Sequence, residues 1–198
     1  MRKITVLDRL LLLATGLLAA YELALGIDGI DTLATLCYSI AFGVLLLSGL
    51  LIIIFGFEIL DDSIVVRVAA LIPLSLALGL IAQYFPSFAL AYAIFAVVGW
   101  LAIAGTRRWG SNKLATLTLA IVHGVAGLTI VLVPIALTWQ GVTDPSFLWV
   151  AVGGILISGG GMLLGWLRMG YPPIPARNIL AALPGLLLAS TAAFVVGL

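Results

Sequence analysis

Residues 33–56 read LATLCYSIAFGVLLLSGLLIIIFG, a run of 24 residues without one charged side chain. An α-helix rises about 1.5 Å per residue and the hydrocarbon core of a bilayer is about 30 Å thick, so about 20 apolar residues suffice to cross it. This run is therefore long enough and apolar enough to span a membrane as a helix.

Apolar stretches of similar length recur on both sides of this run, and we count seven in all. They cover residues 10–26, 33–56, 64–84, 88–105, 114–138, 147–167 and 178–198. Connections such as 27–32 are too short to lead elsewhere, so successive helices should be antiparallel neighbours. Residues 1–20 imitate a secretory signal peptide, but we interpret them as part of a genuine first span. The sequence predicts an all-α polytopic membrane protein with a single transmembrane domain, residues 1–198.

The composition excludes an ordinary water-soluble globule. Hydrophobic residues make up 64% of the chain and charged residues 9%, whereas soluble domains carry about 25% charged residues. A net charge of +1 without a basic cluster argues against a nucleic-acid partner. The lone Cys37 excludes an intrachain disulfide, and we expect no metal site and no cofactor. The expected partner is the lipid bilayer.

The basic residues predict the orientation. If the N-terminus is cytoplasmic, every Lys and Arg falls on the cytoplasmic side: Arg2, Lys3, Arg9, Arg67, Arg107, Arg108, Lys113, Arg168 and Arg177. Asp28, Asp31 and Asp144 then fall on the other side. The positive-inside rule therefore predicts a cytoplasmic-membrane protein with its N-terminus inside and its C-terminus outside.

Polar residues and prolines predict where helices begin and bend. Expected caps precede five of the spans: Asp31, Asp62 with Ser63, Ser87, Ser111 with Asn112, and Asp144 followed by Pro145. Prolines inside three spans should kink their helices: Pro73, Pro134 and Pro184. The proline-rich residues 171–176 should form an extended connector.

A glycine pattern appears three times. Pairs of glycines six residues apart lie in the second, fourth and sixth spans: Gly43 and Gly49, Gly99 and Gly105, Gly153 and Gly159. Gly79-Leu and Gly127-Leu each precede a proline by the same distance, whereas Gly16-Leu17 is followed by Leu23 at that position. The pattern predicts three repeated helical hairpins, approximately residues 10–56, 64–105 and 114–167, followed by an extra helix, 178–198.

A Gly-Leu helix with a proline at its end, a short connection and a returning helix with spaced glycines resemble the HdeD acid-resistance family of short-repeat membrane proteins. The resemblance covers roughly residues 10–167 and implies a helical membrane protein with a link to acid stress. It implies no particular catalytic or transport chemistry for this chain. Two features depart from the family: the missing proline in the first hairpin and the seventh span.

The role of the glycines can be predicted from physical principles, independently of the family resemblance. Close approach of backbones drives association of helices in lipid, and small residues permit it. We therefore predict packing roles for the paired glycines above and for Gly161 and Gly165 in the sixth span. Packing within one chain is favoured over a homo-oligomer interface, which stays open.

Glu22 is the only carboxylate well inside a predicted span, and Tyr21 and Gln83 lie at similar depth. Because an ionisable group in a membrane is a functional hypothesis by default, these residues form a candidate proton or cation site in an outward cavity. The alternative is a carboxylate that merely reaches the interface.

His123, the only histidine, falls near the middle of the fifth span. It could relay protons or ligate a cofactor through one nitrogen, but we favour a neutral imidazole bonded to a neighbouring helix.

No catalytic motif appears in the sequence, so we do not expect an enzyme. The leading hypothesis is a non-enzymatic integral membrane protein with a role in acid stress. Two alternatives stay open: a small-molecule carrier, and an accessory subunit of a larger membrane complex.

Overall fold

A computed structural model describes residues 2–27 and 29–198, with the side chain of Asn112 excepted. The predicted outer position of Asp28 and the predicted cap by Asn112 lie outside this description. The described residues form helices and no strand, which confirms the all-α class. The elements are α1 (Val6–Leu25), α2 (Thr32–Phe55), η1 (Phe57–Asp61), α3 (Ser63–Ala69), α4 (Leu71–Tyr84), α5 (Pro86–Trp109), α6 (Asn112–Trp139), η2 (Pro145–Phe147), α7 (Leu148–Arg168) and α8 (Ala176–Gly197).

Six helical segments of the described chain are long and apolar enough to cross a membrane. They are Thr32–Phe55, Ser63–Tyr84, Pro86–Trp109, Lys113–Trp139, Pro145–Arg168 and Ala176–Gly197. The first predicted span corresponds to α1, which is helical over 20 residues but carries Asp8, Arg9 and Glu22. These three charges keep α1 outside the set, so the structure supports a six-helix membrane protein and leaves the seventh span as a prediction.

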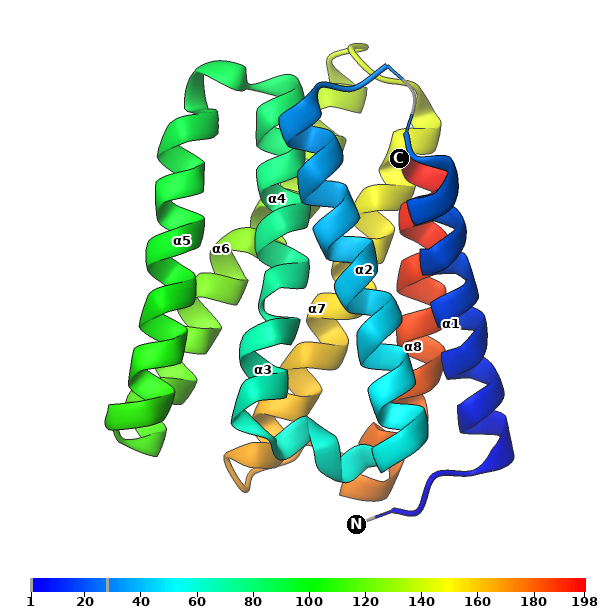
Figure 1. Ribbon diagram of the computed structural model, residues 1–198, viewed down its shortest axis with the longest axis vertical. Coiled ribbons are helices and arrows are strands. Elements are labelled where there is room, and N and C mark those ends of the chain that lie inside the picture. Colours follow the sequence, from blue (N-terminus) through cyan, green and yellow to red (C-terminus); the bar gives the residue numbers. More distant parts are fainter. Residues whose placement is uncertain (1, 28) are drawn as a thin grey trace.

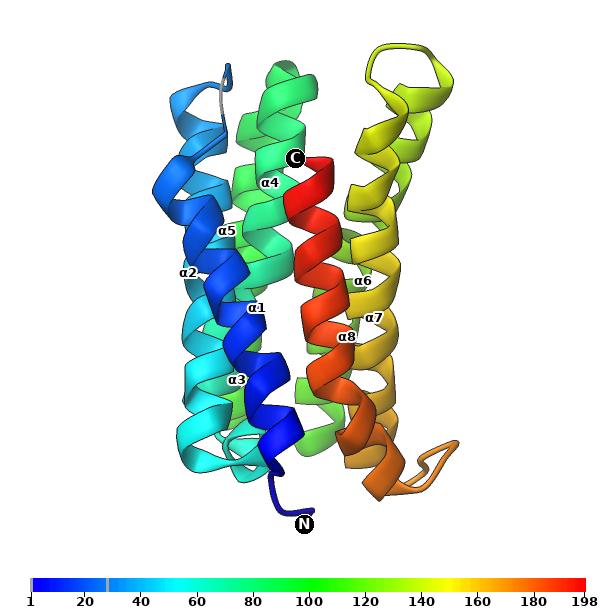
Figure 2. The ribbon, with the colours of Figure 1, turned by 90° about the vertical axis from the view of Figure 1, so that its right-hand side faces the viewer.

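The helices form a bundle in which six pack as a closed ring (Figures 1 and 2). Around the ring, α1 contacts α2, α2 contacts α4, α4 contacts α6, α6 contacts α7, α7 contacts α8, and α8 returns to α1. The remaining long helix, α5, lies outside the ring against α4 and α6 (Figure 1). The two long helices that correspond to each predicted hairpin contact each other: α1 with α2, α4 with α5, and α6 with α7.

The bundle holds a large core and a smaller one near the start of α1. Phe42, Leu76 and Phe194 are fully buried in the large core. The small core joins five buried residues from four elements: Leu12, Ile52, Phe57, Leu180 and Leu183. Many apolar side chains on the outside are exposed instead, such as Leu90, which is 75% exposed. An apolar exterior of this kind suits lipid contact.

Prolines change the helices in two ways. The predicted span 64–84 is split at Ala70 into α3 and α4. Pro73 has no amide hydrogen, so the carbonyl of Ala69 loses its helical donor at the end of α3. Pro184 lies inside the continuous helix α8 and leaves the carbonyl of Leu180 without a partner in the same way. The guanidinium of Arg2 donates to this carbonyl across 3.4 Å.

Three predicted caps are confirmed. The carboxylate of Asp31 accepts from the amide of Ala34 at 2.8 Å. Asp62 accepts from two amides at the start of α3, and the hydroxyl of Ser111 accepts from the amide of Leu114 at 3.3 Å.

Two predicted caps are wrong. Helix α5 begins at Pro86 with Phe85 before it, so Ser87 is already inside the helix and caps nothing. Pro145 begins a short 3₁₀ turn, and the side chain of Asp144 makes no capping hydrogen bond. Proline fixes the backbone of the first turn at both sites, so these helices begin without a side-chain acceptor.

The two ends of the bundle differ in charge. Helix α1 begins and α8 ends at opposite ends (Figure 2). All nine Lys and Arg lie at the end where α1 begins, which we call the basic end. They precede α1, lie in its first turn, lie in α3, or flank the α5–α6 and α7–α8 connections. Asp31 and Asp144 lie at the other end, which we call the acidic end.

Candidate functional site

The structure does not assemble the predicted site around Glu22. Glu22 lies in the last turns of α1 with 9% of its surface exposed, whereas Tyr21 is 55% exposed. Among the described side chains, no hydrogen bond joins Glu22 to Tyr21 or to Gln83. Glu22 is thus a nearly buried carboxylate for which residues 2–27 and 29–198 provide no side-chain hydrogen-bond donor.

Gln83 belongs to a different network. The hydroxyl of Tyr38 in α2 donates to Oε1 of Gln83 at 3.0 Å, and Nε2 of Gln83 donates to the hydroxyl of Tyr84 at 3.3 Å. The ring of Tyr84 packs against Phe147, with 5.1 Å between ring centroids. Tyr38 is 2% exposed. These contacts connect α2, α4 and η2 near the acidic end.

This network has a weak signal in the sequence, because Tyr38 lies inside the apolar run 33–56 and Gln83 has the only side-chain amide in residues 64–84. In a membrane helix such groups need partners in neighbouring helices. The correct pairing of Gln83 with Tyr38 depends on which helices are neighbours, and that information comes from the fold.

His123 lies in α6 and is half-buried. The ring is near the carbonyl of Leu119, but Nδ1 is buried and makes no hydrogen bond of good geometry with any described atom. Nε of Arg107 is buried without a partner as well. The described residues contain no group of three His, Cys, Asp or Glu side chains that could hold a metal ion.

Several predicted glycines occur at close helix contacts. A Cβ atom added to Gly49 would lie 3.2 Å from the backbone oxygen of Leu12, and one added to Gly99 would lie 3.0 Å from Val122. A Cβ atom on Gly153 would lie 2.6 Å from the ring of Phe194. These three glycines therefore allow α1–α2, α5–α6 and α7–α8 to approach closely.

The other predicted glycines have open space or meet only their own helix. Four have no atom within 4 Å of an added Cβ: Gly43, Gly159, Gly161 and Gly165. Gly105 meets only the ring of Trp109, at 3.8 Å. By contrast, a Cβ atom on Gly79 would lie 2.6 Å from the ring of Tyr38, so the sequence pattern identified only part of the packing glycines.

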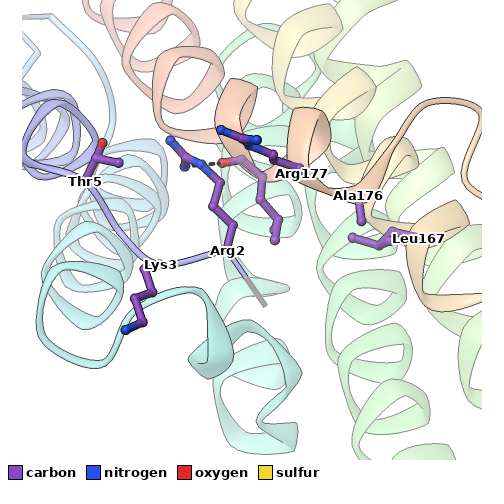
Figure 3. A pocket seen from close by; sticks show the side chains of 7 residues that line it. Arg2, Lys3, Thr5, Leu167, Ala176 and Arg177 are labelled. Atoms are coloured by element: carbon purple, nitrogen blue, oxygen red, sulfur yellow. Dashed lines mark hydrogen bonds between the residues drawn. The ribbon is translucent and has the colours of Figure 1, made fainter.

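A cavity of about 660 Å³ opens at the basic end beside the N-terminal segment (Figure 3). Its lining combines three cationic residues with a hydroxyl and three apolar side chains. They are Arg2, Lys3, Thr5, Leu167, Ala176, Arg177 and Leu180. From the sequence, these cations were predicted only to determine the orientation in the membrane.

Arg2 is held in place by several contacts beside this cavity. Nη1 lies 2.9 Å from Oδ2 of Asp8, and Nη2 donates to Oδ1 of Asp8 at 3.2 Å. The guanidinium also donates to the Leu180 carbonyl, as described above, and lies 5.6 Å from the centre of the Phe57 ring. Arg2 thereby ties the N-terminal segment to α1, η1 and α8.

Asp8 closes the start of α1 with a capping box. The amide and the hydroxyl of Thr5 each donate to Oδ2 of Asp8 at 2.7 Å, and the Thr5 hydroxyl accepts from the amide of Asp8 at 3.2 Å. Burial opposes ionisation of Asp8, but the hydrogen bonds from Thr5 and the charge of Arg2 outweigh it, so the pKa of Asp8 lies below its ordinary value.

A second cavity of about 300 Å³ adjoins the first, because both are lined by Leu167 and Leu180. The guanidinium of Arg168 and the carboxylate of Asp61 line this second cavity and form an ion pair at 3.3 Å. Together the two cavities follow the basic end from the N-terminal segment to η1.

The long apolar helices fit an integral membrane protein. Comparison with known proteins adds no closer assignment: no family model, no curated protein and no solved structure matches the chain. The resemblance to the HdeD family therefore stays a prediction from the sequence.

Proposed function

We propose that the chain is a seven-pass protein of the cytoplasmic membrane, with the basic end in the cytoplasm and the C-terminus outside. One observation carries this proposal: all nine Lys and Arg lie at one end of the bundle. Cytoplasmic loops of membrane proteins carry such an excess of basic residues. The Lys and Arg of a soluble bundle would be spread over its surface instead.

Helix α1 fits the role of the seventh span. Its charges stand near its two ends, with Asp8 and Arg9 in the first turn and Glu22 near the last. The stretch from Leu10 to Tyr21 between them carries no charge. Because α1 closes the ring between α2 and α8, it would lie at the same depth as the other spans.

Labelling of single cysteines tests this orientation. In a Cys37→Ser background, Gln140→Cys places a thiol at the acidic end and Tyr171→Cys places one at the basic end, and both positions are exposed. A membrane-impermeant maleimide added to intact cells should label the first variant and spare the second until the cells are opened. Labelling of the second variant alone in intact cells would show that the protein has the opposite orientation.

We further propose that the protein acts in acid stress without catalysing a reaction, and that Glu22 is the group that responds to acid. This proposal is supported by the sequence resemblance and by the nearly buried position of Glu22 toward the outward end. A carboxylate there would meet the external medium first when the pH falls.

Survival of acid challenge tests this role in cells with and without the protein. Wild-type protein should raise survival, and Glu22→Gln should remove the gain, because the amide has nearly the same shape but cannot titrate. Glu58→Gln is the matched control, since Glu58 is exposed at the basic end. Equal survival of cells with wild-type and Glu22→Gln protein would refute the role of Glu22.

A further inference from the structure

The cavity at the basic end combines features that a phosphate-bearing lipid would recognise. Lys3 and Arg177 line it from two different elements, the N-terminal segment and the first turn of α8 (Figure 3). Leu167 and Leu180 supply apolar lining beside these charges. An anionic headgroup joined to hydrocarbon chains needs this combination of cations and apolar surface.

The charges of the cavity do not cancel. Asp8 pairs with Arg2 and balances it, whereas Lys3 and Arg177 form no ion pair with any carboxylate in the described part of the chain. Asp61, the acidic residue of the adjoining cavity, pairs with Arg168. Two positive charges therefore remain beside the cavity for an anion.

The start of α8 adds a second reason to expect an anion. Arg177 is the second residue of α8, where the helix dipole disfavours a cation. No acidic residue stands in this first turn, and Pro175 before it provides no side-chain cap. A bound anion would offset both the positive end of the helix and the charge of Arg177.

We propose that this cavity binds the phosphate group of an anionic phospholipid, attracted by the charges of Lys3 and Arg177. A volume of about 660 Å³ lies within the range of small-ligand pockets. The position at the end of membrane-crossing helices and the apolar walls favour a lipid over a soluble phosphate. Assignment of this lipid to the cytoplasmic leaflet rests on the proposed orientation, but binding itself does not.

Native mass spectrometry of protein released from nanodiscs tests the site. The nanodiscs contain equal parts of phosphatidylcholine and phosphatidylglycerol, and both leaflets are accessible, so the result is independent of orientation in the cell. Wild-type protein should retain phosphatidylglycerol in preference to phosphatidylcholine. Lys3→Gln with Arg177→Gln should lower this preference by about fivefold for each cation removed.

The control removes the same charge from the same end of the bundle. Arg108→Gln with Lys113→Gln alters exposed cations at the α5–α6 connection, outside the lining of the cavity. This control should keep the wild-type preference. Thermal melting in detergent verifies that both double variants fold, which is expected because Lys3 and Arg177 are exposed.

Three results would overturn the proposal. Wild-type protein without a preference for phosphatidylglycerol would show that the cavity holds no anionic lipid. Equal losses in the two double variants would show that the charge of the whole basic end attracts lipid. Displacement of phosphatidylglycerol by millimolar inorganic phosphate would show that the site takes a soluble anion. The cysteine labelling above decides the orientation separately.

Discussion

The two ends of the bundle are closed by different chemistry. At the basic end, the ion pair of Arg2 and Asp8 joins the N-terminal segment to the first helix over a small separate core. At the acidic end, neutral hydrogen bonds from Tyr38 through Gln83 to Tyr84 join the helices, with an aromatic contact beside them. One set of interactions depends on ionisation and the other does not.

This difference suits the proposed orientation. Hydroxyl and amide groups stay uncharged throughout the acidic range, so acid outside the cell would leave the network at the acidic end intact. Carboxylate pairs lose their charge when the pH falls, and the two ion pairs of the described chain both lie at the basic end, which would face the buffered cytoplasm.

The largest effect is expected at Asp8. Asp8→Ala removes the capping box and leaves Arg2 without its carboxylate, and we expect a loss of about 3 kcal/mol in the free energy of unfolding. Helical content followed during denaturation of the purified protein in mixed micelles would measure it. A loss below about 1 kcal/mol, the usual value of an exposed ion pair, would mean that the pair is effectively solvent-exposed.

The same residue should make stability depend on pH. Asp8→Asn keeps the size of the side chain and removes its charge. Because the folded state lowers the pKa of Asp8 below 3.8, the ionised carboxylate stabilises the protein above that pH. The stability advantage of wild type over Asp8→Asn should hold from neutral pH to about this value and shrink as the pH falls through the lowered pKa. An advantage that shrinks already between pH 7 and pH 5 would assign the dependence to another group.

The second largest loss of stability is expected at a close packing contact toward the acidic end. Gly79→Ala places a Cβ atom 2.6 Å from the ring of Tyr38, so the ring must move. We expect a destabilisation of about 2 kcal/mol from this overpacking. Gly43→Ala is the control, because its added Cβ has no atom within 4 Å. The control should be neutral or slightly stabilising, and equal losses at the two positions would contradict the contact.

The hydrogen bonds of Tyr38, Gln83 and Tyr84 should contribute less to the free energy of unfolding than the packing at Gly79. Tyr38→Phe removes the hydroxyl that donates to Gln83, and a single neutral hydrogen bond contributes about 1 kcal/mol. The loss should be the same at pH 7 and pH 4, because neither partner changes charge in this range. Tyr21→Phe is the control, since Tyr21 is 55% exposed and belongs to no described network. A loss that varied with pH would link the network to an ionised group.

The sequence predicts the helices of this protein better than it predicts the contacts between them. Hydrophobic length located every long helix, and the caps by Asp31, Asp62 and Ser111 follow from local residue chemistry. The cap by Asp144 failed because a proline-led 3₁₀ turn came between it and α7. Hydrophobicity alone does not determine whether α1 crosses the membrane, because this helix of membrane length carries three charged residues.

The candidate sites depend on which helices are neighbours, and the sequence has little information on this point. Gln83 lies at the depth expected for a partner of Glu22, yet its hydrogen bonds go to Tyr38 and Tyr84. The glycine pattern correctly marks Gly153 as a close contact, but the same pattern at Gly159 faces open space. Apolar residues toward lipid and toward another helix look alike in a sequence.

The smallest effect is expected at Asp61, although it also forms an ion pair at the basic end. The carboxylate of Asp61 lies 3.3 Å from Arg168, but its side chain is 59% exposed, against 3% for Asp8. Water and salt screen an exposed pair, so Asp61→Asn should cost no more than about 0.5 kcal/mol, and less at high salt. The denaturation assay used for Asp8 would measure it at two salt concentrations. A loss close to that of Asp8→Ala would show that the second cavity is dry, and that charge closes the whole basic end rather than the N-terminal segment alone.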